Sequence, residues 1–322
     1  MANKAVWLFL LCAGSFAVAC QPAGDSTGTS DGTETVTILG TLTGNGEEKL
    51  MAAIAPFTEA TGIEVVYEGT DAFTTLISVR VDSGDAPDIA LFPQPGLMLD
   101  FAQQGDLVPQ PRADLEDAYD PYWLDLASIN DELYGVWMRA DVKSLVWYNP
   151  QAFAAAGYTI PLTWDGLQVL TQQMITNGHT PWCIGLESGA ATGWVGTDWL
   201  EEILLRQAGP EIYDQWVAHE IPFTHPAIAQ ALNAFGEIVR DPNQVQGGAT
   251  GAISIPFGDS PQALFTESPG CYLHRQASFI SDFLPSGLVP EETVDVFALP
   301  PIQPGQGNPV LVGGIVYGQF ND

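Results

Sequence analysis

Side chains able to catalyse hydrolysis or bind a metal occur in this sequence, but their spacing matches no catalytic motif. The 322 residues include 39 Asp and Glu, four His and four Cys. Paired carboxylates cleave glycosidic bonds, so the acids alone leave a glycoside hydrolase as an alternative. His219 and Glu220 lack the second His of a zinc-peptidase motif, and the sequence has neither a serine-nucleophile motif nor a Walker motif. We therefore expect no catalytic residue, no bound metal and no cofactor.

The charge balance narrows the class of ligand. Nine Lys and Arg oppose 39 acids, which gives a formal net charge of -30. Nucleic acids and anionic lipid surfaces are bound by clusters of Lys and Arg, so the shortage of bases argues against both partners. The long-range field also repels anions, which favours a neutral or cationic small molecule. With 46% hydrophobic and 10% aromatic residues, the chain can form ordinary buried cores.

The N-terminal residues are typical of an exported lipoprotein. A short apolar run over 5–18 is followed by small residues, and Ala17-Val18-Ala19 stands directly before Cys20. Residues 1–20 are therefore predicted to be a lipoprotein signal peptide, with Cys20 as the lipidated residue. The Gly-, Ser- and Thr-rich stretch 21–33 is predicted to be a flexible tether. An ordinary secretory signal is the alternative.

Cys183 and Cys271 remain in the predicted globular part of the chain. Exported proteins with two such cysteines usually pair them, so a disulfide that closes a long loop is expected. A pair of metal ligands is the alternative, but neither cysteine belongs to a C-x-x-C motif.

Alternating strand and helix patterns predict an α/β protein. Alternation over 34–39 and 63–67, and a short apolar run at 89–92, indicate strands, and each is followed by apolar residues at helical spacing. This order is typical of a sheet with right-handed crossovers. A second region begins near 142, where strands are predicted at 144–148, 182–186 and 270–273 and helices at 150–157, 164–174, 194–208 and 226–239.

Several motifs occur in an order that is specific to one family. They are SGDAPDIALFPQPG at 83–96, FAQQGDLVP at 101–109, ADVKSLVWYNPQAF at 140–153, PWCIGLESG at 181–189 and LVGG at 311–314. With these motifs, the chain resembles the family-1 extracellular solute-binding proteins of bacterial ABC importers. Within that family it looks closest to the branch that binds α-glucosides and other oligosaccharides.

The resemblance implies a two-lobed, periplasmic-binding-protein-like α/β fold of type II, whose lobes are joined by crossing strands. Residues 34–139 and 294–322 would form the N-terminal lobe, and residues 140–293 the C-terminal lobe. Family members continue beyond the LVGG segment, so we expect the C-terminal lobe to lack its last helices in this sequence.

The resemblance also implies a binding protein, not an enzyme. It would capture a small neutral carbohydrate, an α-glucoside or another oligosaccharide, and deliver it to the permease subunits of an ABC transporter. It would act as an exported monomer, held by a lipid anchor and facing the periplasm or the cell exterior. A secreted glycoside hydrolase and a surface adhesin without a small ligand are the alternatives.

Candidate ligand contacts are aromatic and planar polar side chains near the ends of predicted strands. Aromatic rings stack on the apolar face of a sugar, and carboxylate, amide and guanidinium groups bind its hydroxyls. From the resemblance and from their positions at strand ends, we expect ligand contacts from Asn45, Glu47, Phe92, Gln94, Trp137, Arg139, Asp141, Glu187, Trp194, Asp198, His274, Arg275, Gln276, Gly313 and Gly314.

Structural roles are the alternatives for several of these residues. The alternatives are a helix cap for Glu47, a core position for Phe92 and Trp137, an ion pair between Arg139 and Asp141, and a buried structural role for His274.

Overall fold

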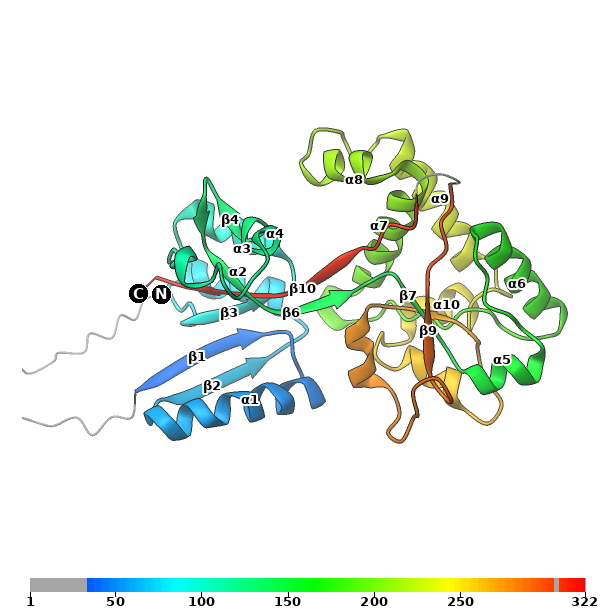
Figure 1. Cartoon of the computed structure of the whole chain (residues 1–322), viewed down its shortest axis with the longest axis horizontal. Helices are drawn as coiled ribbons and strands as arrows, with labels where there is room; N and C mark the ends of the chain where they lie inside the picture. The colour runs from blue at the N-terminus through cyan, green and yellow to red at the C-terminus, as the bar shows by residue number, and fades with distance from the viewer. Residues whose placement is uncertain (1–33, 304–306, 322) are drawn as a thin grey trace, which may run out of the picture. The chain divides into compact units, whose positions relative to one another are not determined.

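The computed structural model describes residues 34–303 and 307–321. The predicted signal peptide at 1–20, the lipidation site Cys20 and the tether at 21–33 lie outside the described residues. Every helix in the described ranges is too short or too polar to be a candidate for crossing a membrane. Two larger sheets, each with its own hydrophobic core, organise this part of the chain into two lobes (Figure 1).

The first lobe is built around a five-stranded sheet with the order β2-β1-β3-β10-β6. β1 (Thr35–Gly40) is parallel to β2 (Glu64–Gly69) and to β3 (Ile89–Phe92), because helices return the chain between these strands. The helices that follow the three strands are α1 (Asn45–Thr61), α2 (Phe73–Ser83) and α3 (Pro95–Gln104). The strand–helix alternation expected from the sequence is confirmed here.

The core of the first lobe joins the sheet to α2 and α3. Phe73 of α2 meets Phe92 of β3 edge to face at 5.5 Å, and Phe101 of α3 lies 5.9 Å from Phe92. In contrast, α1 has no buried residue. The short elements of this lobe are η1 (Arg112–Asp114), α4 (Pro121–Asp125), and the paired strands β4 (Ser128–Ile129) and β5 (Glu132–Leu133).

The second lobe has a smaller sheet and more helices. β7 (Leu145–Tyr148) is the central strand and runs antiparallel to β8 (His274–Arg275) and β9 (Asp295–Ala298). The helical elements of this lobe are α5 (Pro150–Ala156), α6 (Trp164–Thr176), η2 (Gly189–Ala191), α7 (Trp194–Ala208), α8 (Pro210–Val217), α9 (Pro226–Arg240), α10 (Gly248–Ser254), η3 (Ser260–Phe265) and η4 (Ser278–Phe283).

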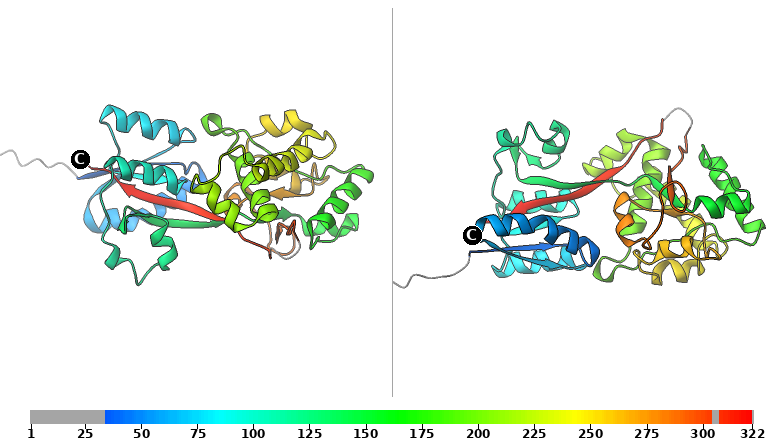
Figure 2. Two further views of the ribbon diagram at one scale, coloured as in Figure 1. Left: turned by 90° about the horizontal axis from the view of Figure 1, so that it is seen from above. Right: turned by 60° about the horizontal axis from the view of Figure 1, so that its bottom comes forward.

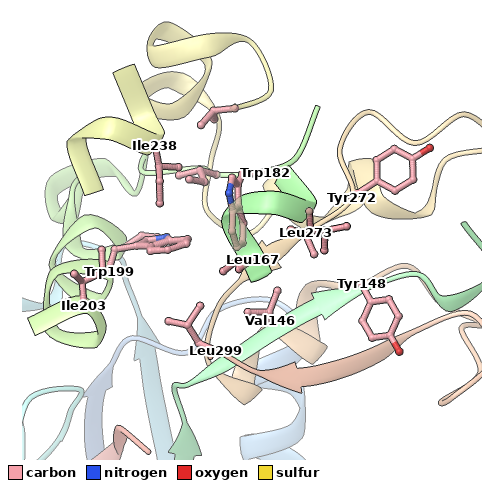
Figure 3. Close-up of a cluster of buried hydrophobic side chains, with 14 of the residues drawn as sticks. Val146, Tyr148, Leu167, Trp182, Trp199, Ile203, Ile238, Tyr272, Leu273 and Leu299 are labelled. Atoms are coloured by element: carbon pink, nitrogen blue, oxygen red, sulfur yellow. The ribbon is translucent and has the colours of Figure 1, made fainter. Parts of the chain in front are cut away.

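The core of the second lobe fixes its longer helices against the sheet. Trp182 and Trp199 are fully buried and meet edge to face at 5.1 Å. They lie in one cluster with Val146 of β7, Ile238 of α9 and Leu299 (Figure 3). Removing these large apolar surfaces from water stabilises the position of α7, which carries several of the predicted site residues.

Two strands of the first sheet connect directly to the second lobe. β6 (Gly135–Val142) continues through Lys143 and Ser144 into β7, and β10 (Val312–Gln319) follows the segment after β9. β10 is antiparallel to both β3 and β6, and Figure 2 shows β10 beside β6. Crossing strands therefore join the lobes, as the resemblance implied.

The predicted lobe boundary at 294 is wrong by one strand. β9 lies within the segment 294–322 that was assigned to the N-terminal lobe, but it pairs with β7 of the second sheet. Phe297 and Leu299 are buried in the core of the second lobe. The return to the first lobe therefore begins after Leu299.

Two predicted strands are also wrong. Residues 182–186 make only isolated bridges, because their backbone bonds to helices and loops instead of to a neighbouring strand. The Leu186 amide, for example, donates to the Ala252 carbonyl of α10 at 2.7 Å. The strand predicted at 270–273 begins only at His274.

The predicted disulfide is present. Cys183 and Cys271 are bonded, with their Cα atoms 5.4 Å apart, and both residues are buried. The bond joins the segment that leads to Glu187 with the segment that leads into β8. Two stretches with predicted site residues are thus held together covalently.

Substitution of Gly314 in β10 tests how closely β10 and β6 must approach each other. An added Cβ at this position would stand 1.9 Å from the Arg139 carbonyl oxygen of β6. Because that neighbour is backbone, we expect Gly314→Ala to lower the free energy of unfolding by about 1–3 kcal/mol. Urea-induced unfolding would measure the change.

Gly96→Ala in α3 is the matched control, since an added Cβ there meets no atom within 4 Å. It should leave stability unchanged or raise it by up to about 1 kcal/mol. If both variants unfold at the wild-type urea concentration, the close approach at Gly314 is not a constraint.

Candidate ligand-binding site

A cavity of about 400 Å³ is lined by residues from both lobes. The first lobe contributes the turns after β1 and β2, and the second lobe contributes the segments around Glu187, Phe257 and Phe283. Sugar-sized ligands fit cavities of this order. The full lining is Thr43, Gly69, Thr70, Asp71, Glu187, Ser188, Gly189, Pro256, Phe257 and Phe283.

Glu187 is the sequence-predicted residue that lines this cavity. Its amide donates to the Ile255 carbonyl at 3.2 Å, which fixes the backbone next to Phe257. Its Oε1 accepts a hydrogen bond from the Gly189 amide at 2.8 Å, and the side chain is half-buried. The carboxylate is thus held at the cavity with its second oxygen available to a ligand.

Four half-buried aromatic rings form an aromatic wall beside the cavity: Trp194, Phe257, Phe279 and Phe283. Trp194 lies 5.2 Å from Phe257, and Phe257 lies 5.1 Å from Phe283. Only Trp194 was predicted. Phe279 and Phe283 both belong to the 3-10 helix η4, whose short length gives no clear periodic signal in the sequence.

Arg139 and Asp141 of β6 connect to the aromatic wall. Arg139 Nε donates to Asp141 at 2.9 Å, and the guanidinium lies 5.8 Å from the centre of the Phe279 ring. Ser278 donates through its hydroxyl to the other Asp141 oxygen at 3.1 Å. The ion pair that was considered as an alternative role is therefore present. It orients Arg139 over an aromatic ring, where a cation is favourable.

The turn after β1 brings Asn45 and Glu47 to the start of α1. Tyr67 donates to the Leu42 carbonyl at 3.0 Å and accepts from the Leu42 amide at 2.9 Å, which fixes this turn. Burial raises the pKa of Tyr67 to about 12. The hydrogen bond with Leu42 lowers this pKa, and the negative charge of Glu47 raises it further. Asn45 donates to the Asp282 carbonyl of η4 at 3.5 Å, so the turn faces the second lobe.

Other predicted contacts in the first lobe belong elsewhere. Phe92 is fully buried among Phe73 and Phe101, and Trp137 is buried with its indole nitrogen donating to the Trp123 carbonyl at 2.7 Å. Both are core residues, so their predicted ligand contacts are corrected. Gln94 is exposed at the N-terminal end of α3 and does not line the cavity.

Asp198 and Arg275 belong to a buried ionic cluster on α7. The cluster contains three acids and three bases: Lys143, Asp198, Glu201, Glu202, Arg206 and Arg275. Lys143 Nζ lies 2.9 Å from Asp198, and Arg275 lies 3.2 Å from Glu202. The side chains of Glu202, Arg206 and Arg275 are fully buried. The predicted ligand roles of Asp198 and Arg275 are therefore replaced by structural ones.

The same cluster holds both segments that pass between the lobes. Ser144, next to Lys143, donates to Glu202 at 2.9 Å and accepts from the Leu311 amide at 2.8 Å. Arg206 Nε donates to the Leu299 carbonyl at 3.1 Å. Burial lowers the pKa of Lys143, but the nearby acids outweigh it and the net shift is upward. Lys143 thus keeps its positive charge beside the segments that the cluster fastens.

His274 and Gln276 are buried on β8 and just beyond it. His274 Nδ1 lies 2.9 Å from the Cys183 carbonyl, and complete burial lowers the pKa of this histidine to about 4. His274 is therefore neutral at pH 7. Gln276 accepts from the Ala277 amide at 2.9 Å. The predicted ligand contacts at both residues are corrected to buried positions.

Gly313 and Gly314 meet other parts of this chain. A Cβ on Gly313 would stand 2.8 Å from the Lys143 side chain, and one on Gly314 would meet the Arg139 backbone. Their lack of a side chain therefore serves the packing of β10 on β6, and the predicted backbone contact with a ligand stays a prediction.

The architecture and the cavity agree with a comparison to protein families. The family model described as "Bacterial extracellular solute-binding protein" matches residues 43–320. The chain belongs to this family. It is therefore a binding protein and not an enzyme, and it is an exported protein. Among the described residues, no group of three or more His, Cys, Asp or Glu is placed to hold a metal ion.

Two curated relatives of this solute-binding protein are similar over most of the chain. One is the osmoprotective compounds-binding protein GgtB of Synechocystis sp., 57% identical over 291 residues that cover 89% of this chain and 69% of the relative. The other is the alpha-glucosides-binding periplasmic protein AglE of Rhizobium meliloti, 43% identical over 293 residues that cover 87% of this chain and 64% of the relative. The chain thus spans about two thirds of their lengths.

Solved structures share the fold at low sequence identity. A chitin oligosaccharide binding protein has a TM-score of 0.74 at 18% identity and covers 90% of this chain and 74% of that chain. A protein from a study of xylan utilisation by Caldanaerobius polysaccharolyticus has a TM-score of 0.76 at 20% identity, covering 89% and 73%. These likenesses support the two-lobed α/β fold.

The ionic cluster yields a prediction about stability. Glu202→Gln keeps the side-chain shape but removes the charge that faces Arg206 and Arg275. Leaving buried guanidinium groups without full compensation should lower the free energy of unfolding by about 3–5 kcal/mol, as measured by urea titration.

Glu116→Gln is the control, because Glu116 is 64% exposed and lies 3.7 Å from Arg112. Its effect should stay below about 1 kcal/mol. Similar losses in the free energy of unfolding of the two variants would show that the buried cluster stabilises the protein no more than an exposed ion pair does.

Proposed function

We propose that this solute-binding protein captures a neutral carbohydrate, an α-glucoside or another oligosaccharide, between its lobes and delivers it to the permease of an ABC importer. One observation carries the proposal: the cavity of about 400 Å³ presents a carboxylate from each lobe, Asp71 and Glu187, and the aromatic rings of Phe257 and Phe283 from the second lobe. Aromatic rings cover the apolar face of a sugar, and carboxylates accept hydrogen bonds from its hydroxyls.

The names of the relatives support the class of ligand. The Rhizobium relative is named for α-glucosides and the Synechocystis relative for osmoprotective compounds, and a structural relative binds chitin oligosaccharide. The shortage of bases in this chain agrees with a ligand that carries no negative charge.

Capture would proceed by closure of the two lobes around the sugar. Glu187 and the aromatic wall would bind it from the second lobe, while Asn45 and Glu47 approach with the turn after β1. Arg139 and Asp141 lie on a crossing strand, where they can contact a ligand and also move with the hinge. Hinge closure of this kind is a known mode of ligand binding.

Delivery requires that the protein stays near its membrane partner. We propose that Cys20 carries the lipid anchor and that residues 21–33 act as a tether for a monomeric protein facing the periplasm or the cell exterior. A flexible polar tether would let the lobes reach the permease subunits while the anchor prevents loss by diffusion.

A panel of sugars tests the proposed ligand class. Maltose, trehalose and sucrose are added to the purified protein at about 100 times their dissociation constants, and the free energy of unfolding should rise by about 2.7 kcal/mol for a true ligand. Cellobiose and a linear polyol are the comparison compounds. If no carbohydrate or polyol stabilises the protein, the proposed function fails, and hydrolysis of these sugars at enzyme-like rates would contradict it as well.

Glu187→Ala tests the site. Loss of a charged acceptor should weaken sugar binding by more than about tenfold in titration calorimetry, since hydrogen bonds to charged groups contribute roughly 1.5–3 kcal/mol. Glu211→Ala is the control, because Glu211 is exposed on α8 and does not line the cavity. Wild-type affinity in Glu187→Ala would reject the role of this carboxylate.

A further inference from the structure

Asp71 is a second carboxylate in the candidate cavity, and it comes from the opposite lobe to Glu187. It lies between β2 and α2, is exposed, and lines the cavity together with Glu187. In the described part of the chain, neither acid has an ion-pair partner within 4.0 Å. The cavity lining contains no Lys, Arg or His.

Both carboxylates lie against the same residue. Glu187 accepts a hydrogen bond from the Gly189 amide at 2.8 Å, and Asp71 Oδ2 lies 2.2 Å from the position that a Cβ on Gly189 would occupy. Gly189 also has a φ of +51°, which favours glycine. The absence of a side chain at 189 therefore lets Asp71 of the first lobe lie against the residue whose amide binds the Glu187 carboxylate.

An ion pair between the lobes, that of Lys49 with Asp282, does not involve these two acids. Lys49 of α1 lies 2.5 Å from Asp282 of η4, so its charge is already matched. Asp71 and Glu187 thus line the same cavity as two acids, with no base in the lining, and like charges disfavour each other when they approach.

We propose that Asp71 and Glu187 form a carboxylate pair that selects the charge of the ligand. The pair accepts hydrogen bonds from a hydroxyl-rich molecule that bridges the lobes, and it excludes sugars that carry a carboxylate or a phosphate. Without a ligand, repulsion within the pair disfavours the approach of the lobes. This inference rests on the proposed function and assigns Asp71 as a specificity-determining residue.

The repulsion has a consequence for the empty protein. Hydroxyl donors on a bound sugar satisfy both carboxylates, so the closed arrangement becomes favourable only when a ligand is present. A ligand shifts such an equilibrium by its differential affinity for the two arrangements. An anionic sugar would add a third negative charge to the cavity. It would therefore not bind the closed arrangement more tightly than the open one.

The test compares a neutral sugar with its acidic counterpart. Titration calorimetry measures the affinities of an α-glucoside and the corresponding α-glucuronide for wild type, Asp71→Asn and Asp82→Asn. Asp82 is an exposed acid of α2 outside the cavity lining, so it controls for the loss of one charge. In Asp71→Asn, the preference for the neutral sugar should fall by about tenfold or more, the size of one charge-assisted interaction. An unchanged preference, or an equal fall in Asp82→Asn, overturns the proposal.

A second measurement does not depend on any sugar. Small-angle X-ray scattering of the ligand-free proteins should give a smaller radius of gyration for Asp71→Asn than for wild type and Asp82→Asn. Equal radii for all three proteins would contradict the repulsion. Because this experiment uses no ligand, it separates failure of the carboxylate pair from failure of the proposed sugar-binding function, which the sugar panel tests.

Discussion

The rest of the structure depends on the ionic cluster that α7 holds beneath the crossing segments. Three acids of α7 face Lys143, Arg206 and Arg275 in a region that water scarcely reaches. Removing buried charges from water is costly, and the balance of acids and bases offsets this cost, with further hydrogen bonds from Ser144 and backbone carbonyls. Ser144 and the carbonyl of Leu299 supply such bonds from the outgoing and the returning segment. Both connections between the lobes are thereby anchored to one helix.

This anchoring separates rigid from adaptable parts of the molecule. The second lobe presents Glu187 and the aromatic wall from a well-packed core with a disulfide nearby. The first lobe meets it through side chains such as Lys49 and Asn45, which are exposed and make few contacts. Solvent screens contacts of that kind, so each contributes little to stability. Motion between the lobes can thus occur without disturbing the residues that recognise the ligand.

Periodicity and family motifs predicted the fold well, because strand–helix alternation and helix caps are local properties. α7 and β3 begin and end where the sequence indicated. The site was harder, since burial depends on residues far apart in the chain. Asp198 and Arg275 were predicted as ligand contacts from the resemblance and from their positions near strand ends, yet they compensate one another in the interior. Asp71 and Phe257 went unnoticed because nothing near them in sequence shows that their loops converge on Glu187.

The disulfide between Cys183 and Cys271 also bears on when the second lobe can reach its full stability. Such bonds do not persist in a reducing cytosol, so an exported chain acquires this one only after it leaves. Before then, the unfolded chain keeps the conformational entropy of the long loop that contains α7 to α10. Closing this loop with the disulfide destabilises the unfolded chain by roughly 4–5 kcal/mol. The chain is therefore easier to keep unfolded on the side where it is made. Once outside, oxidation removes that freedom and makes folding of the second lobe hard to reverse.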